Sequence, residues 1–292
     1  MEFMYLLSTS KAWLLVTVGL LSLLIGSFLN VVIYRLPIML ERQWRRDCQE
    51  WLNKHPPESD LGSHFNLVVP RSQCPTCGHQ ITAIENIPII SYLALGGKCR
   101  GCKTPISMQY PLVEAATAAL SMLVAWRVGF GLELVLLLGF TWTLVALFMI
   151  DANTMLLPDV ITYPLLWAGL MANLSNTFVA LPDAVMGAAL GYLSLWSVFH
   201  LFRLLTGKEG MGHGDFKLLA ALGAWGGWQI LPFVIFASSA FGAIFGISLM
   251  LIKRNRENTP MPFGPWLAMA GLVAVVWRTE ILGIMQKIFL PY

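Results

Sequence analysis

Two aspartates, Asp151 and Asp215, each lie where a long apolar stretch meets a loop. A charged side chain costs about 2.5 kcal/mol or more at the bilayer centre and less near the interface, so an acid at this depth indicates a function. Asp151 closes an apolar run, where the dipole of a helix C-terminus disfavours an anion. Asp215 follows Gly212-His213-Gly214, and glycines there let another backbone approach closely.

A pair of such acids has a known chemistry. Two carboxyl groups that meet cannot both ionise, so one shared proton leaves a base that activates water and an acid that protonates the leaving group. The pattern therefore predicts that Asp151 and Asp215 act together as in an aspartic protease. The alternative is that each is a helix-end acid paired with Lys217 or His213.

Three other acids lie in or against apolar runs. Asp159 and Asp183 each follow Leu-Pro at the start of such a run, where the positive end of a helix dipole stabilises an acid. A structural role explains Asp183 fully and is the better interpretation of Asp159. For Glu114 two roles stay open, namely support of the aspartate pair and binding of a helix partner.

Four cysteines form a second chemical pattern. They make two Cys-x-x-Cys knuckles, Cys74 with Cys77 and Cys99 with Cys102. Four thiolates satisfy tetrahedral Zn²⁺ completely and leave no position for water, so the predicted zinc is structural. A redox Cys-x-x-Cys is disfavoured because there are two knuckles and no βαβ context. The fifth cysteine, Cys48, is expected to be a small buried hydrophobe.

The elements that position these residues are membrane helices. The 292 residues are 57% hydrophobic and 12% charged, with a mean hydropathy of +0.67, which excludes a soluble globular protein. Windows of about 20 apolar residues predict an all-α polytopic membrane protein with about eight transmembrane helices, of which the sixth and eighth are short. These spans are Ala12–Tyr34, Tyr110–Trp126, Leu132–Ile150, Leu157–Leu174, Ala184–Leu205, Phe216–Trp228, Ile230–Ile252 and Pro262–Trp277. The alternative for the sixth, Phe216–Trp228, is a re-entrant hairpin, which would reverse the topology after it and place Lys253–Arg256 outside.

The basic residues predict the orientation. With the N-terminus outside, 15 of the 19 Lys and Arg residues fall in loops on one side, which the positive-inside rule assigns to the cytoplasm. The net charge of +3 therefore requires no nucleic-acid partner. Both aspartates lie at the cytoplasmic boundary in this topology. The cysteines lie in the reducing cytoplasm, which disfavours disulfides.

Three segments are expected. Residues 1–35 form the first transmembrane helix, which stays as an anchor because no A-x-A-like cleavage site follows it. Residues 36–109 form a small cytoplasmic zinc-ribbon-like domain, and 110–292 a membrane-embedded domain. Within Met39–His55, Trp44 and Trp51 recur among arginines as in a helix lying on the membrane surface, or equally in one packed on the zinc-bearing part.

The chain resembles the type IV prepilin peptidases, bifunctional enzymes within the G-x-G-D class of aspartic proteases. The resemblance covers nearly the whole sequence and includes both cysteine knuckles. Its other motifs are Gly26-Ser27-Phe28-Leu29-Asn30-Val31-Val32-Ile33-Tyr34-Arg35-Leu36-Pro37, Tyr110-Pro111-Leu112-Val113-Glu114, Asp151, Leu157-Pro158-Asp159, Gly212-His213-Gly214-Asp215-Phe216-Lys217 and Pro262-Phe263-Gly264-Pro265.

The resemblance implies two reactions in the bacterial inner membrane. Family members remove the short basic leader of prepilins and pseudopilins, and then methylate the new N-terminal residue with S-adenosylmethionine. It implies Asp151 and Asp215 as the catalytic pair at the cytoplasmic face. We also expect the Gly212–Gly214 loop to hold the extended substrate through backbone hydrogen bonds.

The methyltransferase is less visible, because the sequence has no G-x-G-x-x-G after a strand. The family associates methylation with the region around Gly96-Gly97-Lys98, which makes Gly97 and Lys98 candidate residues for the methyl donor. A plain turn before Cys99 explains the glycines equally well.

Two other classes of protein share parts of the pattern. A transporter also carries intramembrane acids, but should show a hydropathy repeat between its halves, which this sequence lacks. A non-enzymatic pilus or secretion assembly factor would use the cysteines and leave both aspartates idle.

Overall fold

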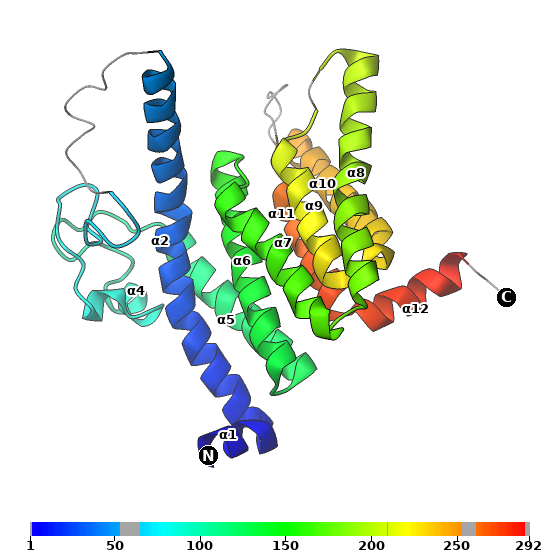
Figure 1. Cartoon of the computed structure of the whole chain (residues 1–292). Coiled ribbons are helices and arrows are strands. Elements are labelled where there is room, and N and C mark those ends of the chain that lie inside the picture. Colours follow the sequence, from blue (N-terminus) through cyan, green and yellow to red (C-terminus); the bar gives the residue numbers. More distant parts are fainter. Residues whose placement is uncertain (1, 53–64, 209, 253–260, 290–292) are drawn as a thin grey trace. The chain divides into compact units, whose positions relative to one another are not determined.

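The structure, a computed structural model, describes residues 2–52, 65–208, 210–252 and 261–289. The described residues are almost entirely helical and hold no β-strand beyond two isolated bridges, which confirms the predicted all-α class. The chain divides into two compact units, Met1–Gly129 and Phe130–Tyr292 (Figure 1). The cysteines belong to the first unit and the two aspartates to the second.

The first unit is built on two long helices that pack against each other, α2 and α5. A side chain at Gly26 of α2 would place its β-carbon 2.8 Å from the Cα of Glu114 on α5, so the missing side chain permits the contact. The segment between the two helices carries the cysteines. The elements of this unit are α1 (Glu2–Thr9), α2 (Lys11–Trp51), the 3₁₀ turn η1 (Ile84–Asn86), α4 (Ile90–Ala94) and α5 (Gln109–Val128).

Helix α2 is longer than the predicted first span. It continues past Tyr34 and through Pro37 to Trp51 as one helix (Figure 1). Its 41 residues extend about 60 Å, roughly twice the hydrocarbon thickness of a bilayer. A separate helix from Met39 lying on the membrane surface is therefore wrong, because these residues prolong the axis of the span. His55, the predicted end of that helix, lies outside the described residues.

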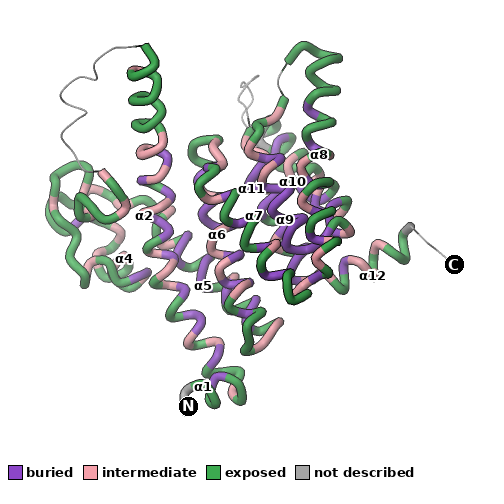
Figure 2. The backbone as a smooth tube through the Cα atoms, viewed as in Figure 1, coloured by how far each residue is buried: buried purple, intermediate pink, exposed green. Residues whose placement is uncertain are grey.

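The second unit is arranged around one short helix, α9. From Asp215 to Gly226 every residue of α9 except Lys217 is buried, and α7, α8 and α11 surround it (Figure 2). The elements of this unit are α6 (Leu132–Thr154), α7 (Asp159–Ala172), η2 (Asn173–Ser175), α8 (Leu181–Thr206), α9 (His213–Gly226), η3 (Trp228–Ile230), α10 (Leu231–Ile252), α11 (Gly264–Val276) and α12 (Arg278–Phe289).

Fewer helices reach full spanning length than the eight predicted. The described residues hold five helices long and apolar enough to cross a membrane, or six if α11 and α12, which meet at a 95° bend, count as one. Helices α7 and α9 have 14 residues each, about 21 Å, which is short of the roughly 30 Å hydrocarbon core. The apolar composition of α9 reflects its burial among the helices that surround it.

Glycines allow α8 and α9 to touch backbone to backbone. A side chain at Gly187 of α8 would overlap the carbonyl group of Gly223 on α9, and one at Gly191 would lie 2.6 Å from the carbonyl oxygen of Leu219. Small residues are what bring membrane helices this close. The position of α9, and with it that of Asp215, depends on this contact.

We predict that Gly187→Ala destabilises the protein. The added methyl group must push α8 away from α9, and overpacking of this kind costs about 1–3 kcal/mol. The measurement is the midpoint of thermal unfolding in detergent. Gly139→Ala on α6 is the matched control, because a β-carbon there meets no atom within 4 Å. Equal midpoints for the two variants would contradict the packing described.

Candidate active site and metal centre

Asp151 lies in the last turn of α6 and is 5% exposed. The helix ends three residues later, at Thr154, because Met155 adopts a left-handed conformation with φ +56°, and its N–H donates to the carbonyl oxygen of Asp151 at 2.8 Å. The turn redirects the chain into Leu157-Pro158 and α7. One carboxyl oxygen of Asp151, Oδ2, is buried and has no hydrogen-bond partner among the described residues. A buried polar atom of this kind requires a proton, water or ligand to satisfy it.

Asp215 lies in the first turn of α9 and is 6% exposed. Gly212 precedes the helix in an extended conformation, with φ −78° and ψ 146°, and its carbonyl oxygen accepts from the N–H of Asp215 at 3.3 Å. The positive end of the α9 dipole faces this carboxyl group, whereas Asp151 lies at the negative end of α6. The two acids therefore have opposite electrostatic surroundings, which suits different protonation states.

The two carboxyl groups lie near enough for the charge of Asp151 to act on that of Asp215. Neither aspartate has an ion-pair partner in the described part of the chain. Lys217, which sequence reasoning offered as a partner, instead binds Asp159 through both carboxylate oxygens at 2.6 and 2.8 Å. The ring of His213 packs against Phe199 and Phe216. The two acids thus lie near each other, and no cationic side chain among the described residues forms an ion pair with either.

Sequence reasoning missed Gly264, the first residue of α11. A β-carbon at Gly264 would lie 2.5 Å from Oδ2 of Asp151 and 3.1 Å from Cδ1 of Leu157. Any side chain at position 264 would therefore displace the carboxyl group. The Pro-Phe-Gly-Pro break before an apolar run was the available signal, but it did not indicate which side chain the glycine faces.

The two loop glycines differ in surroundings. Gly212 has room, because the only atom near its missing β-carbon is Oδ2 of Asp215 at 3.7 Å. Gly214 lies inside the first turn of α9, where a β-carbon would approach that of Leu157 to 2.7 Å. Only Gly212 is therefore in the extended conformation that a strand-like contact with substrate needs. The substrate-binding role of both glycines stays a prediction.

The remaining acids have partners that explain them. Asp183, in the first turn of α8, accepts a hydrogen bond from the indole nitrogen of Trp228 at 3.0 Å. Glu114 belongs to the first unit, where it accepts from the backbone N–H of Ile89 at 2.8 Å and from the hydroxyl of Ser27. Two roles were left open for Glu114, and the structure supports the second, binding of a helix partner, because Ser27 lies on α2.

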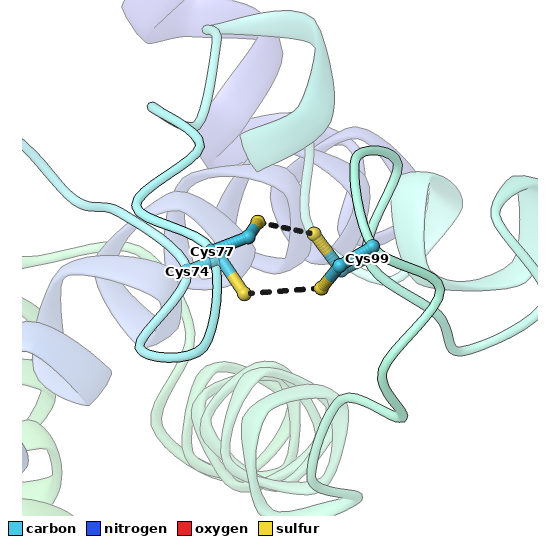
Figure 3. Close-up of side chains that lie close together, drawn as sticks. Cys74, Cys77 and Cys99 are labelled. Atoms are coloured by element: carbon cyan, nitrogen blue, oxygen red, sulfur yellow. Dashed lines mark hydrogen bonds between the residues drawn. The ribbon is translucent and has the colours of Figure 1, made fainter.

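The four cysteines of the two knuckles converge in the first unit (Figure 3). The sulfur atoms of Cys74 and Cys102 are 3.8 Å apart, and those of Cys77 and Cys99 are 3.9 Å apart. Four sulfurs at 2.3 Å from a tetrahedral zinc ion would be about 3.8 Å from one another. The cluster therefore fits zinc, and four thiolates leave no open position for catalysis.

A polar layer supports this metal centre. Glu85 accepts from the backbone N–H and the hydroxyl of Thr82, at 2.9 and 3.0 Å, and pairs with His79 and Arg100. Hydrogen bonds from Thr82 lower the pKa of Glu85 to about 2, so its carboxylate stays ionised. Hydrogen bonds with Thr104 lower the pKa of Cys102 to about 6, which favours the thiolate that a metal requires.

Gly97 and Lys98 lie in a tight turn before Cys99. Gly96 and Gly97 have φ values of +60° and +67°, which glycine adopts without strain. A β-carbon at Gly97 would lie 2.9 Å from the hydroxyl oxygen of Tyr92, while Lys98 is exposed. The turn that sequence reasoning offered as an alternative is present, and a role for the two residues with the methyl donor stays a prediction.

Comparison with known proteins relates both units to one family. Residues 20–128 match the family model of the bacterial peptidase A24 N-terminal domain, and residues 138–247 that of the type IV leader peptidase family. Proteins named prepilin leader peptidase/N-methyltransferase are similar over most of their length. That of Pseudomonas putida is 54% identical over 94% of each chain, and that of Aeromonas salmonicida is 57% identical over 90% of this chain and 91% of its own.

The chain belongs to the prepilin leader peptidase/N-methyltransferase family. The relative from Pseudomonas aeruginosa is 55% identical over 95% of this chain. No solved structure matches the chain. Membership of this family confirms the resemblance drawn from the sequence motifs and assigns the two aspartates to its peptidase region.

We predict that the purified protein carries about one zinc ion per chain, because the four sulfur atoms have the spacing of a ZnS₄ site. Cys99→Ser should lose that zinc and lower the midpoint of thermal unfolding, since the ion holds the two knuckles together. Elemental analysis by mass spectrometry measures the content. Cys48→Ser is the matched control, since Cys48 lies outside the cluster on α2, where it is exposed and not buried as the sequence predicted. Zinc-free protein, or equal loss in both variants, would contradict the site.

Proposed function

We propose that the protein removes the leader of type IV prepilins by an aspartate-pair mechanism and then methylates the new N-terminus. The relatives that carry both activities in their names support the two reactions. The observation that supports the mechanism is the proximity of two buried carboxyl groups, Asp151 and Asp215, neither of which pairs with a cationic side chain of the described residues. Aspartic proteases require that arrangement.

The cleavage step follows from one proton shared by the pair. The ionised carboxylate takes a proton from a water molecule, whose oxygen bonds to the carbonyl carbon of the scissile peptide. The protonated carboxyl then gives its proton to the leaving nitrogen as the C–N bond breaks. Asp215 at the helix N-terminus is suited to be the ionised partner, and Asp151 with its unpartnered oxygen to be the protonated one.

The distribution of charged and apolar residues in the substrate suits the location of Asp151 and Asp215 at helix ends. A prepilin or pseudopilin has a short basic leader followed by an apolar stem, so its scissile bond lies at a membrane boundary. Asp151 and Asp215 lie at helix ends rather than in the middle of a span. With the basic loops in the cytoplasm, this boundary is the cytoplasmic face of the bacterial inner membrane.

Methylation uses the amine that cleavage releases. S-adenosylmethionine supplies an electrophilic methyl group on a sulfonium sulfur. The amine nitrogen bonds to that carbon while the C–S bond breaks, the electron pair stays on sulfur, and the nitrogen loses a proton. The chain's part is to bind the donor and to orient the amine.

We expect Asp151→Asn and Asp215→Asn each to lower the rate of leader cleavage by about 10²–10⁴-fold, because each removes one partner of the proton transfer. The assay follows leader loss from a prepilin peptide with purified protein in detergent. Asp183→Asn is the control acid, since the carboxylate of Asp183 accepts a hydrogen bond from the indole of Trp228. A normal cleavage rate in Asp151→Asn or in Asp215→Asn would contradict the mechanism.

Gly264→Ala tests the fit around Asp151. The added methyl group would push the carboxyl group aside, and a displacement near 1 Å costs roughly 10²-fold in rate. We expect cleavage to fall by about that factor with the zinc content unchanged. Gly139→Ala, on the same helix as Asp151, should cleave at the normal rate. A normal cleavage rate in Gly264→Ala would show that the space between Gly264 and the carboxyl group of Asp151 is not needed for catalysis.

A further inference from the structure

The first unit encloses a cavity that the cleavage reaction does not use. Its volume is about 540 Å³, within the range of roughly 300–1,000 Å³ typical of small-molecule sites. Helices α2 and α5 form one wall, and the segment that carries the cysteines forms the other. About half of the lining residues are apolar or aromatic and about half are polar or charged, a mixture that distinguishes the cavity from an apolar packing defect.

One polar atom in the wall lacks a partner. Asn30 of α2 is 5% exposed, and its Nδ2 donates to the carbonyl oxygen of Tyr110 at 3.1 Å, which fixes the plane of the amide. Its Oδ1 is buried and accepts no hydrogen bond from any described residue. Leaving a buried amide oxygen unpaired costs about 1–3 kcal/mol, so a donor is expected from whatever fills the cavity.

A buried acid lies in the same wall. Glu114 is 8% exposed, and the N–H of Ile89 holds its Oε2 at 2.8 Å. Ile89 has φ +58°, a conformation that costs a β-branched residue roughly 1–3 kcal/mol and tends to occur at functional sites. The carboxyl group is thus fixed in place, and no cationic side chain of the described residues pairs with it. It is suited to a ligand that brings its own positive charge.

The cationic side chain nearest in sequence to Asn30 is already engaged. Arg35 donates to the carbonyl oxygens of Asn66 and Pro70 at 2.9 and 2.7 Å, so it holds the loop that forms part of the cavity wall. Two further arginines line the cavity, Arg71 and Arg100, and Arg100 pairs with Glu85 at 3.6 Å. Aromatic rings in the lining come from Tyr34, Phe65, Tyr92 and Tyr110. Such rings stack on a planar base and attract a cation through their faces.

We propose that this cavity binds S-adenosylmethionine, with Glu114 and Asn30 as its polar anchors. The inference rests on the methyltransferase activity proposed above and deepens it by naming the site. The donor is a sulfonium that also carries an ammonium group and an adenine ring. Glu114 accepts from the ammonium or faces the sulfonium, Oδ1 of Asn30 accepts from an N–H or hydroxyl of the donor, and the tyrosines contact the ring.

This assignment gives the Gly97 turn a physical role. Gly97 does not line the cavity, but Tyr92 does, and a side chain at Gly97 would displace the Tyr92 hydroxyl. The zinc knuckles adjoin the cavity through Cys74 and Cys99, which line it. Zinc therefore positions the wall of the methyl-donor site and takes no part in the transfer.

The test measures binding of S-adenosylmethionine to the whole purified protein by isothermal titration calorimetry. Glu114→Gln and Asn30→Ala should each raise the dissociation constant at least tenfold. The side-chain oxygen of the glutamine can still accept the hydrogen bond from the Ile89 N–H, so this variant keeps the contact between α5 and the residue before α4. Glu41→Gln, an exposed acid on the same helix as Asn30, is the control and should bind like the unaltered protein. Zinc content and the unfolding midpoint without ligand check that each variant is folded.

A second readout works on the unaltered chain. Ultraviolet cross-linking with S-adenosylmethionine labelled in its methyl group should mark peptides that contain Tyr34, Tyr92 or Tyr110. Normal affinity in both folded variants, or a label confined to residues 130–292, overturns the assignment of the cavity while leaving the methyltransferase intact. Absence of both binding and methylation in the unaltered protein would instead overturn the proposed activity itself.

Discussion

A carboxyl group buried at membrane depth without a cation is the constraint on which the second unit depends. Such a group is tolerated only when a proton, a hydrogen bond or a second acid sharing one proton compensates for its lost hydration. Here two acids lie near each other, and no cationic side chain among the described residues forms an ion pair with either. Lys217, the nearest lysine in sequence, is held on Asp159 instead. The pair is thereby left to titrate as a unit, as peptide hydrolysis requires.

Several features of the unit keep this meeting in place. Backbone contact between α8 and α9 at Gly187 and Gly223 fixes the helix that carries Asp215, and Gly264 lets α11 approach Asp151. Leu157 contacts both Gly214 and Gly264, so it links the first turns of α9 and α11. In the first unit zinc does the corresponding work, because it joins two knuckles that no sheet or large core would hold together.

Chemistry was easier to predict from the sequence than geometry. The aspartates and cysteines could be selected because charges and thiols are rare in an apolar chain, and their spacing limits what they can do. The shortness of α9 was also predicted, but the full length of α2 and the shortness of α7 were not, because an apolar run has the same sequence pattern whether lipid or protein covers it. Gly264 was missed for a related reason, since a glycine's role is set by the side chain it faces in three dimensions. Asn30 and Glu114 could not be linked from the sequence, because only the folded structure shows that they line the same cavity.

Infrared difference spectroscopy of the purified protein tests the shared proton most directly, because a protonated carboxyl group has a carbonyl stretch that a carboxylate lacks. At neutral pH the account predicts one such band from the pair, lost in Asp151→Asn and equally in Asp215→Asn, since either change ends the sharing. A spectrum in which neither substitution alters the protonated carboxyl bands would contradict it, because both aspartates would then be ionised and independent.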